Sequence, residues 1–512
     1  MGQGKKAPGQ AADPSVEIEA RKSHYEGASF ELKKGFSRLT ILSMTVILMA
    51  TWEALSSTMV SGLVSGGPVS LVYGFLLAII GALATAASLG ELASMYPTAG
   101  GQYHFTAKLA PKRIKNALSW SIGWIGTFGW IAFAASAPFL SATMIQGVVA
   151  LYHESYGMER WQGTLIYWAL IGMGTAINIW GSRLVSIVET VSLVIHICAF
   201  IAIFAVLWAC TPAMHSAGFV FGTFLNSSGW SSSGVAWSIG MLSSCYVLAG
   251  YDGAIHLAEE MNNPAVAVPY CMLGSLAING TMGFAFLLAL LFCMGDLETT
   301  LNSPTGFPVI EIFRSITDSR AASAVMTTFL ILTAWLATIA LLASAGRMVW
   351  SLARDKAIPG YKYLAKLDAK TQLPTRSILA TSTVLVIMGF VNIGSTTAFN
   401  AIISLAVLGL HVSYLVPVAL MLWHRLPSRR TSLVYGPWQL GRLGVPINII
   451  SVVYLSYTTI FMVFPPYQPV TAKNMNYSSL ILGAVLIFSV VYWAWKGRRE
   501  YTGPNIEMHS WQ

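Results

Sequence analysis

Long apolar runs recur along this chain and constrain its fold more than any other feature. A helix that crosses a bilayer needs about 17–25 consecutive, mostly apolar residues. Only 10% of the 512 residues are charged, against about 25% in soluble domains. We therefore predict an all-α membrane domain over residues 41–496, flanked by tails at 1–40 and 497–512. It should contain twelve transmembrane helices, at residues 41–65, 69–95, 117–151, 164–181, 184–210, 235–260, 269–294, 322–352, 377–394, 397–423, 446–464 and 479–496.

The distribution of positive charge predicts the orientation of these spans. With the N-terminus inside, 26 of the 30 Lys and Arg residues fall in inner segments or at inner helix ends. This asymmetry satisfies the positive-inside rule, so both termini are expected to be cytoplasmic. Topology therefore accounts for the net charge of +9, and no nucleic-acid partner is expected.

The cysteines and the N-terminal segment exclude several other classes of protein. The five cysteines occur singly, without the spacing of a disulfide framework or a metal site. We expect no cofactor and no metal. The first forty residues are polar and do not resemble a cleavable signal peptide, so the first span should act as the insertion signal. Two sequons, at Asn226 and Asn476, fall in predicted outer loops and could be glycosylated.

The sixth span contains an interruption that suggests a binding site. Gly250 and Gly253 flank Tyr251 and Asp252 within the apolar run 235–260. Two glycines weaken a helix, and a carboxylate is costly in hydrocarbon unless it faces a polar cavity or a partner. A broken helix at this depth is tolerated where it lines a cavity. The alternative is a buried Asp252 that pairs with a neighbour for packing alone.

The first span contains a comparable interruption. Its apolar run meets Trp52-Glu53-Ala54 and then Ser56 and Ser57 before it resumes. Spans 1 and 6 would head the two halves of a five-plus-five arrangement. Paired interruptions at matching positions are typical of transporters built from inverted repeats. We expect the chain to be unwound near residues 52–55 and 248–252, with the two breaks facing each other.

Three further motifs identify a family. Span 2 is followed by Glu91…Pro97…Gly100-Gly101-Gln102-Tyr103. Span 6 is followed by Glu259-Glu260…Pro264, and span 8 ends with Arg347…Arg354-Asp355…Pro359. As a set they resemble the amino acid–polyamine–organocation (APC) superfamily over roughly residues 36–496. Phe464-Pro465-Pro466 and Asn474–Tyr477 are similar to its fungal amino acid/choline branch, which includes choline and 4-aminobutyrate permeases. The resemblance implies twelve helices, ten of them in an inverted repeat, and a substrate site between the breaks of helices 1 and 6.

The resemblance also indicates which residues bind substrate. Many relatives have Gly-Ser-Gly at the first break, whose N–H groups hold a substrate carboxylate, and that triplet falls on Trp52-Glu53-Ala54 here. An acid at this position favours a substrate with a cationic end, held by Glu53 or Asp252 with cation–π contacts to nearby rings. The predicted substrate-binding residues are Trp52, Glu53, Ala54, Ser56, Ser57, Tyr246, Gly250, Tyr251 and Asp252.

Two other buried polar residues are candidates for proton coupling. Glu189 lies in span 5, where some relatives carry a coupling lysine, seven residues before His196. His196 itself is expected to be a packing residue. His256 follows Asp252 by four residues, so the two could pair across one helical turn. Glu91, Arg347, Arg354 and Asp355 are expected to form an inner gate or a structural ion-pair network.

An enzyme is not expected, because the chain has no Gly-x-Ser-x-Gly, His-Glu-x-x-His or phosphate-binding motif. Asp252 and His256 lack a nearby third member of a catalytic group. We expect a proton symporter of the fungal plasma membrane that imports a small amine, such as 4-aminobutyrate or a choline-like solute. The alternatives are a strict choline or quaternary-ammonium carrier, and a nutrient sensor built on a transporter fold. Protons, the substrate and the lipid bilayer are the expected partners.

Overall fold

The fold was analysed in a computed structural model. It describes residues 36–153, 155–394, 398–426, 433–472 and 474–504, so most of the two predicted tails lies outside it. The first half contains α2 (Arg38–Met49), α3 (Thr51–Val64), α4 (Gly67–Met95), α5 (Gln102–Leu109), α6 (Lys115–Tyr152), α7 (Arg160–Trp180), α8 (Ser182–Cys210), α9 (Ala217–Gly222), α10 (Ser233–Gly240), α11 (Leu242–Val247), α12 (Gly253–His256) and η1 (Ala258–Glu260).

The second half continues the all-helical pattern. It contains α13 (Pro264–Cys293), α14 (Leu297–Leu301), α15 (Pro308–Thr317), α16 (Arg320–Arg354), α17 (Tyr361–Leu364), α18 (Thr375–Gly394), α19 (Ala398–Arg425), η3 (Gly441–Leu443), α20 (Gly444–Phe461), α21 (Ser478–Tyr492), η4 (Trp493–Gly497, a π-helical turn) and α22 (Arg498–Glu500). Within the described ranges, eleven helices are long and apolar enough to cross a membrane. The predicted sixth span is divided into short helices, so helix length alone does not reproduce the count of twelve.

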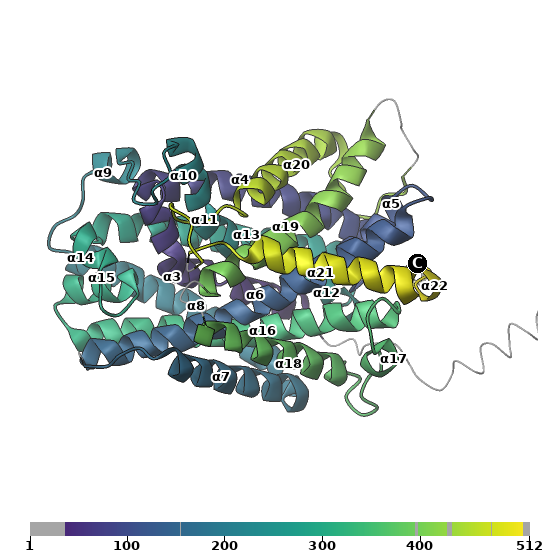
Figure 1. Cartoon of the computed structure of the whole chain (residues 1–512), viewed down its shortest axis with the longest axis horizontal. Helices are drawn as coiled ribbons and strands as arrows, with labels where there is room; N and C mark the ends of the chain where they lie inside the picture. The colour runs from purple at the N-terminus through teal and green to yellow at the C-terminus, as the bar shows by residue number, and fades with distance from the viewer. Residues whose placement is uncertain (1–35, 154, 395–397, 427–432, 473, 505–512) are drawn as a thin grey trace, which may run out of the picture.

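The long helices run roughly along the longest axis of the molecule and leave short helices at its two ends (Figure 1). One end carries α9, α10, α14 and α15; we call it the pocket end, because a pocket described below lies there. The other end carries α5, α17 and α22, and we call it the tail end. The Lys- and Arg-rich connections near α5 and α17 therefore lie at one end, and the connection that contains Asn226 lies toward the other. The predicted topology places these two sets of connections on opposite sides of the membrane.

The break in the first span is shorter than expected and lies elsewhere. Trp52–Leu55 was predicted to be unwound, but these residues form the first turns of α3. The interruption is at Ala50 alone, which has φ 39° and ψ 51° and separates α2 from α3. Residues 52–55 contain no Gly or Pro, so nothing in their own sequence breaks a helix. A left-handed alanine costs roughly 1–2 kcal/mol, and such strain is found where surrounding contacts impose it.

The break in the sixth span, the second of the two breaks, lies where the glycines predicted it. Residues 248–252 are not helical, and they separate α11 from α12. Gly250 has φ +92°, a left-handed conformation that side chains rarely adopt. The Val247 carbonyl at the start of this break accepts a hydrogen bond from the Thr51 hydroxyl at 2.7 Å. The two breaks therefore lie against each other.

The asparagine side chains of the two sequons differ in burial and in hydrogen bonding. Asn476 is buried, and its Nδ2 donates to the carbonyls of Met462 at 2.8 Å and Phe464 at 3.2 Å. The Asn226 side chain is at an exposed turn, where its Nδ2 donates to the Trp230 carbonyl at 2.7 Å. A glycan on Asn476 would replace one of the two Nδ2 hydrogens, so at least one of these bonds would be lost and a sugar would have to fit at a buried position. Asn226 is therefore the sequon that the fold can accommodate in glycosylated form.

We expect any glycan on this protein to be carried by Asn226. Asn226→Gln should abolish the mobility shift caused by a glycosidase, whereas Asn476→Gln should leave the shift unchanged and lower thermal stability. The loss of two buried hydrogen bonds at about 1 kcal/mol each sets the scale of that destabilisation. A glycosidase-sensitive shift that survives in Asn226→Gln would contradict this assignment.

Candidate functional site

The side chain of Asn279 in α13 forms hydrogen bonds to both sides of the first break. Its Oδ1 accepts from the Thr51 N–H at 3.2 Å, and its Nδ2 donates to the Val46 carbonyl at 3.1 Å. One buried amide thus bonds a donor at the start of α3 and an acceptor in α2. Backbone groups freed by a helix break must find such partners in a membrane. The sequence analysis did not single out Asn279.

The second break packs closely against the first span. A Cβ atom added at Gly250 would lie 2.4 Å from Phe133 Cε1 and 2.7 Å from Leu48 Cδ2. A Cβ added at Gly253 would lie 2.8 Å from Leu48 Cδ1. Both predicted glycines are therefore required for close approach, and Gly250 is required for its backbone conformation as well.

Asp252 is buried and bonded to three different helices. Its Oδ2 accepts from Gln102 Nε2 of α5 at 2.7 Å and from Trp130 Nε1 of α6 at 3.1 Å. Its Oδ1 accepts from the Tyr414 hydroxyl of α19 at 2.5 Å. Three donors offset the cost of burying this carboxylate. The predicted alternative for Asp252, pairing with protein neighbours, is therefore the arrangement seen here.

His256 also lies in this cluster. Its Nδ1 is 2.8 Å from the Ala99 carbonyl, so Nδ1 must carry the hydrogen. Its Nε2 then faces Asp252 Oδ2 at 3.5 Å. The predicted proximity across one helical turn is present, although the separation is longer than an ordinary hydrogen bond.

Glu53 is paired with the histidine that was expected only to pack. Glu53 Oε1 lies 2.7 Å from His196 Nδ1, and both side chains are buried. The contact joins the first turn of α3 to the middle of α8. The neighbouring Trp52 ring packs against His196, Phe200 and Phe286, so it lies on the α8 and α13 side of α3.

Glu189 lies on the same helix as His196 and is fully buried. Within the described ranges, neither of its carboxylate oxygens has a hydrogen-bond partner. An ionised carboxylate without partners is very costly in an apolar environment, so Glu189 is expected to carry a proton in this conformation.

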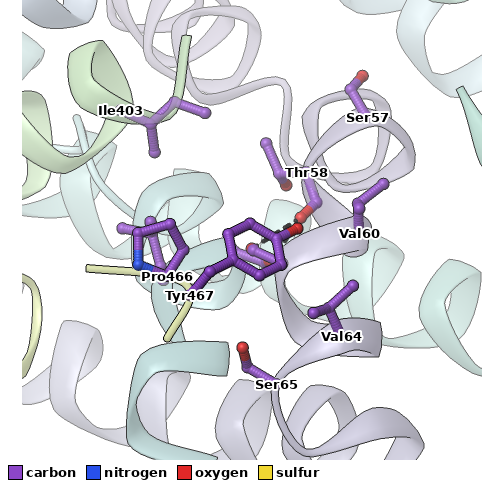
Figure 2. A pocket seen from close by; sticks show the side chains of 11 residues that line it. Ser57, Thr58, Val60, Val64, Ser65, Ile403, Pro466 and Tyr467 are labelled. Carbon is purple, nitrogen blue, oxygen red and sulfur yellow. Dashed lines mark hydrogen bonds between the residues drawn. The ribbon is translucent and has the colours of Figure 1, made fainter. Parts of the chain in front are cut away.

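A polar pocket opens beside α3 at the pocket end of the molecule. Its cavity volume is only about 50 Å³, and it is lined by mostly hydroxyl-bearing and apolar side chains: Ser57, Thr58, Val60, Ser61, Val64, Ser65, Leu242, Ser243, Ile403, Pro466 and Tyr467. Figure 2 shows the Tyr467 ring projecting toward α3, with Thr58 beside it. Ser61 and Ser243 hydroxyls are 2.7 Å apart, which joins α3 to α11 across the pocket wall. None of these lining residues is charged.

The connection between α20 and α21 partly covers this pocket. Pro466 and Tyr467 line it, and the Gln468 N–H donates to the Ser228 carbonyl at 2.7 Å. Trp230 Nε1 donates to the Pro465 carbonyl at 3.1 Å. The covering segment is thus fixed to the connection that precedes α10.

The predicted substrate-binding residues of α3 lie at different positions between the pocket and the first break. Ser57 lines the pocket, and the Glu53 side chain begins one helical turn closer to the break. Ser56 is buried and its hydroxyl donates to the Trp52 carbonyl at 3.0 Å. Ala54, two positions before Ser56, is also buried.

The two predicted tyrosines of the sixth span pack against neighbouring helices. The Tyr246 hydroxyl donates to Ser136 Oγ at 2.6 Å. The Tyr251 ring lies 5.7 Å from the Tyr414 ring. The side chains of Tyr246 and Tyr251 thus contact α6 and α19, Gly250 lies in the second break, and Trp52 packs against α8 and α13.

Ion pairs join helices near the tail end. Arg347 of α16 donates to both carboxylate oxygens of Glu260, and Arg425 of α19 donates to Glu91 of α4. Arg354 bonds Glu259 through two contacts, at 2.7 and 2.9 Å. Ion pairs therefore form at Arg347, Arg354 and Glu91, and those of the two α16 arginines attach the segment that follows the second break to α16.

The charged form is favoured at two carboxylates of this region, Glu259 and Asp355. Burial opposes the ionisation of Glu259, but the Arg354 guanidinium and the Ala99 N–H outweigh it and lower the pKa of Glu259 below its usual value. Asp355 accepts from the Tyr103 hydroxyl at 2.7 Å and lies 2.8 Å from His104 Nε2. Tyr103 is the last residue of the Gly-Gly-Gln-Tyr motif and His104 follows it in α5, so this motif is tied to the end of α16.

Comparison with known proteins agrees with this architecture. A family model described as amino acid permease matches residues 35–487. A choline transporter of Saccharomyces cerevisiae is 30% identical over 471 residues, which cover 92% of this chain and 83% of that protein. A putative amino acid/polyamine transporter of Macrophomina phaseolina is 32% identical over 439 residues, 86% of this chain and 97% of the relative. Amino-acid permease 2 of Neurospora crassa is 29% identical over 484 residues, 92% and 86% of the respective chains.

Proposed function

This chain belongs to the amino acid permease family, and from that membership we propose that it is a proton-driven importer of a small amine. The family and its named relatives are permeases and transporters, so the protein is a transporter of amino acids or amine solutes and not an enzyme. The precise substrate, the proton as driving ion and the fungal plasma membrane as location are parts of the proposal.

The observation that carries the proposal is the asymmetry about the two helix breaks. A small pocket adjoins α3 at the pocket end, whereas toward the tail end the buried Arg347–Glu260 pair and the partly buried Arg354–Glu259 pair join η1 to α16. A carrier alternates between states that open to one side at a time around a site at mid-membrane depth. With the tail end in the cytoplasm, this arrangement corresponds to the state whose inner side is closed.

We place the bound substrate where the breaks meet, beside Ala54, Tyr246, Gly250 and Tyr251, with Ser57 on the entry path. Helix α3 has Ala50 as its N-cap residue, which provides no side-chain cap, and the Thr51 N–H is bonded to Asn279 Oδ1. The N–H groups of its first turn would attract the carboxylate of an amino acid substrate. The backbone carbonyl groups of the two breaks and the rings of Tyr246 and Tyr251 would face the ammonium end of the substrate. Glu53 and Asp252 already have protein partners, so we assign neither as the direct ligand of the amine.

The names of the relatives favour two substrate classes. One relative is named a choline transporter and others are named amino-acid permeases. A 4-aminobutyrate-like amino acid has both a carboxylate and an ammonium group for the proposed site, whereas choline uses the ammonium part alone. A strict choline carrier is therefore the second candidate within transport.

An uptake panel tests this function. Cells that produce the protein would be compared with vector cells for labelled choline, 4-aminobutyrate, a polyamine and a neutral α-amino acid, each at pH 5 and pH 7.5. We expect at least one amine to accumulate above the vector level, and to accumulate more at pH 5. Protein that reaches the membrane and accumulates none of these solutes at either pH would contradict the proposal.

A further inference from the structure

The pair formed by Glu53 of α3 and His196 of α8 is not explained by substrate binding. We propose that this pair is the proton-binding site of the transporter, with His196 Nε2 as the atom that takes up and releases the proton. The inference rests on the proposed function, because it assigns the site of the proton that drives import.

The geometry fits a proton site better than a packing contact. Glu53 Oε1 and His196 Nδ1 are 2.7 Å apart, and the two side chains are 1% and 0% exposed. Among the described residues, Glu53 Oε2 and His196 Nε2 have no hydrogen-bond partner. A pair kept only for structure is expected to satisfy such buried polar atoms. Here one atom of each group is left available to a proton or to water.

The chemistry of the pair allows one proton to be gained and lost without breaking its central bond. With Nδ1–H donating to the Glu53 carboxylate, the neutral imidazole has a lone pair at Nε2. A proton that binds there forms an N–H bond, and the pair changes from one negative charge to no net charge. Loss of that proton breaks the same N–H bond and restores the charge. The loaded pair is therefore easier to keep in a water-excluded site.

The position of the pair couples this charge to the moving part of the fold. Glu53 is in the first turn of α3, directly after the break at Ala50. Ser57, one turn further along, lines the pocket. Any movement of α3 relative to α8 during transport would stretch the Glu53–His196 bond. Proton binding would thus stabilise one arrangement of α3 relative to α8.

Other charged groups on helices that pack against α3 and α8 have partners of their own or stand at helix ends. Four of them are bonded within ion pairs: Glu91 to Arg425, Glu311 to Arg314, Arg347 to Glu260 and Arg354 to Glu259. Three arginines are the first residues of their helices: Arg38, Arg160 and Arg320.

Weakly ionising side chains on these helices are bonded to protein groups or exposed. They are Tyr73, Tyr167, Tyr246, Cys245, Cys271 and Cys293, each with a hydrogen-bond contact, and the exposed Tyr270, Cys198 and Cys210. His256 Nε2 likewise has no hydrogen-bond partner among the described residues, but it belongs to α12 and not to these helices. Glu189 remains as the competing candidate on α8. Glu189 lies about 10 Å from His196 along α8 by helical rise, and in the part of the chain that the structure describes its carboxylate has no hydrogen bond to α3.

The test uses the full-length protein in proteoliposomes, with the amine identified by the uptake panel. Steady-state accumulation would be measured against an imposed pH gradient, and exchange of labelled for unlabelled amine would be measured without a gradient. In the wild-type protein, accumulation should rise about tenfold per pH unit if one proton accompanies each substrate. His196→Gln should keep exchange, but its accumulation ratio should stay near one at every gradient. Glu53→Gln should behave in the same way, and Glu189→Gln is the matched control that should keep the gradient response.

Two results would overturn the assignment. One is a normal gradient response in both His196→Gln and Glu53→Gln. The other is a response lost in Glu189→Gln and kept in those two variants, which would make Glu189 the proton carrier. Failure of the proposed function itself is separate, because it would appear as absent exchange and accumulation in the wild-type protein.

Discussion

Replacing Gly250 with alanine should abolish uptake while the protein still reaches the membrane. Gly250 has φ +92°, and an added Cβ atom would lie 2.4 Å from Phe133 Cε1 and 2.7 Å from Leu48 Cδ2. The left-handed conformation would cost an alanine about 1–2 kcal/mol. Overpacking would add roughly 1–3 kcal/mol. Residues 248–252 would avoid both costs by changing conformation or by moving away from α2. The proposed substrate site would then be lost.

The measurement is initial uptake per molecule at the cell surface, with Gly483→Ala as the matched control. Gly483 lies within α21 and has no atom within 4 Å of an added Cβ. An alanine there should be neutral or slightly stabilising. Uptake by Gly250→Ala at the wild-type level would show that the second break is not part of the site.

Breaking the ion pair between Arg347 and Glu260 should produce the largest loss of stability among single substitutions at the tail end. The two side chains are 4% and 5% exposed. Arg347→Met would leave the Glu260 charge buried without its partner, which costs about 3–5 kcal/mol. The segment after the second break would also lose its attachment to α16. We expect a large fall in the apparent melting temperature in detergent, together with loss of gradient-driven accumulation.

A second substitution separates the charge effect from lost packing. In Arg347→Met/Glu260→Met neither charge remains, so the double variant should be more stable than Arg347→Met alone. The control pair is Lys496–Glu500, separated by 3.6 Å, with side chains 45% and 30% exposed. Lys496→Met should change stability by less than about 1 kcal/mol. Equal melting temperatures for Arg347→Met and Lys496→Met would contradict the role assigned to the buried pair.

The sequence predicted the membrane fold because hydrocarbon leaves few alternatives to long apolar helices. The second break was also predicted correctly, because its left-handed backbone conformation favours a glycine, and Gly250 is visible in the sequence. The first break was predicted at residues 52–55 and lies at Ala50 instead. Its position depends on Asn279, which is 228 residues from Thr51 in the sequence. No pattern near Ala50 reveals such a tertiary contact.

The candidate site was predicted less completely than the fold. The sequence identified Glu53 and Asp252 as unusual acids, but not the groups that would bond them. Trp130 and Tyr414 are ordinary aromatic residues of apolar spans until the fold brings them to Asp252. His196 was assigned to packing because its partner lies on another helix, 143 residues away. The serines of the pocket were partly foreseen, through Ser57, because they follow Glu53 along one helix.

Exchange in proteoliposomes tests the central claim, that this chain carries an amine through a site at the junction of its two broken helices. Vesicles would be loaded with a high concentration of the unlabelled amine and diluted into a trace of the labelled compound, without a pH gradient. A carrier with one alternating site should concentrate the label transiently inside, and Gly250→Ala should show no such overshoot. Absence of an overshoot with wild-type protein, for every amine in the panel, would contradict the account.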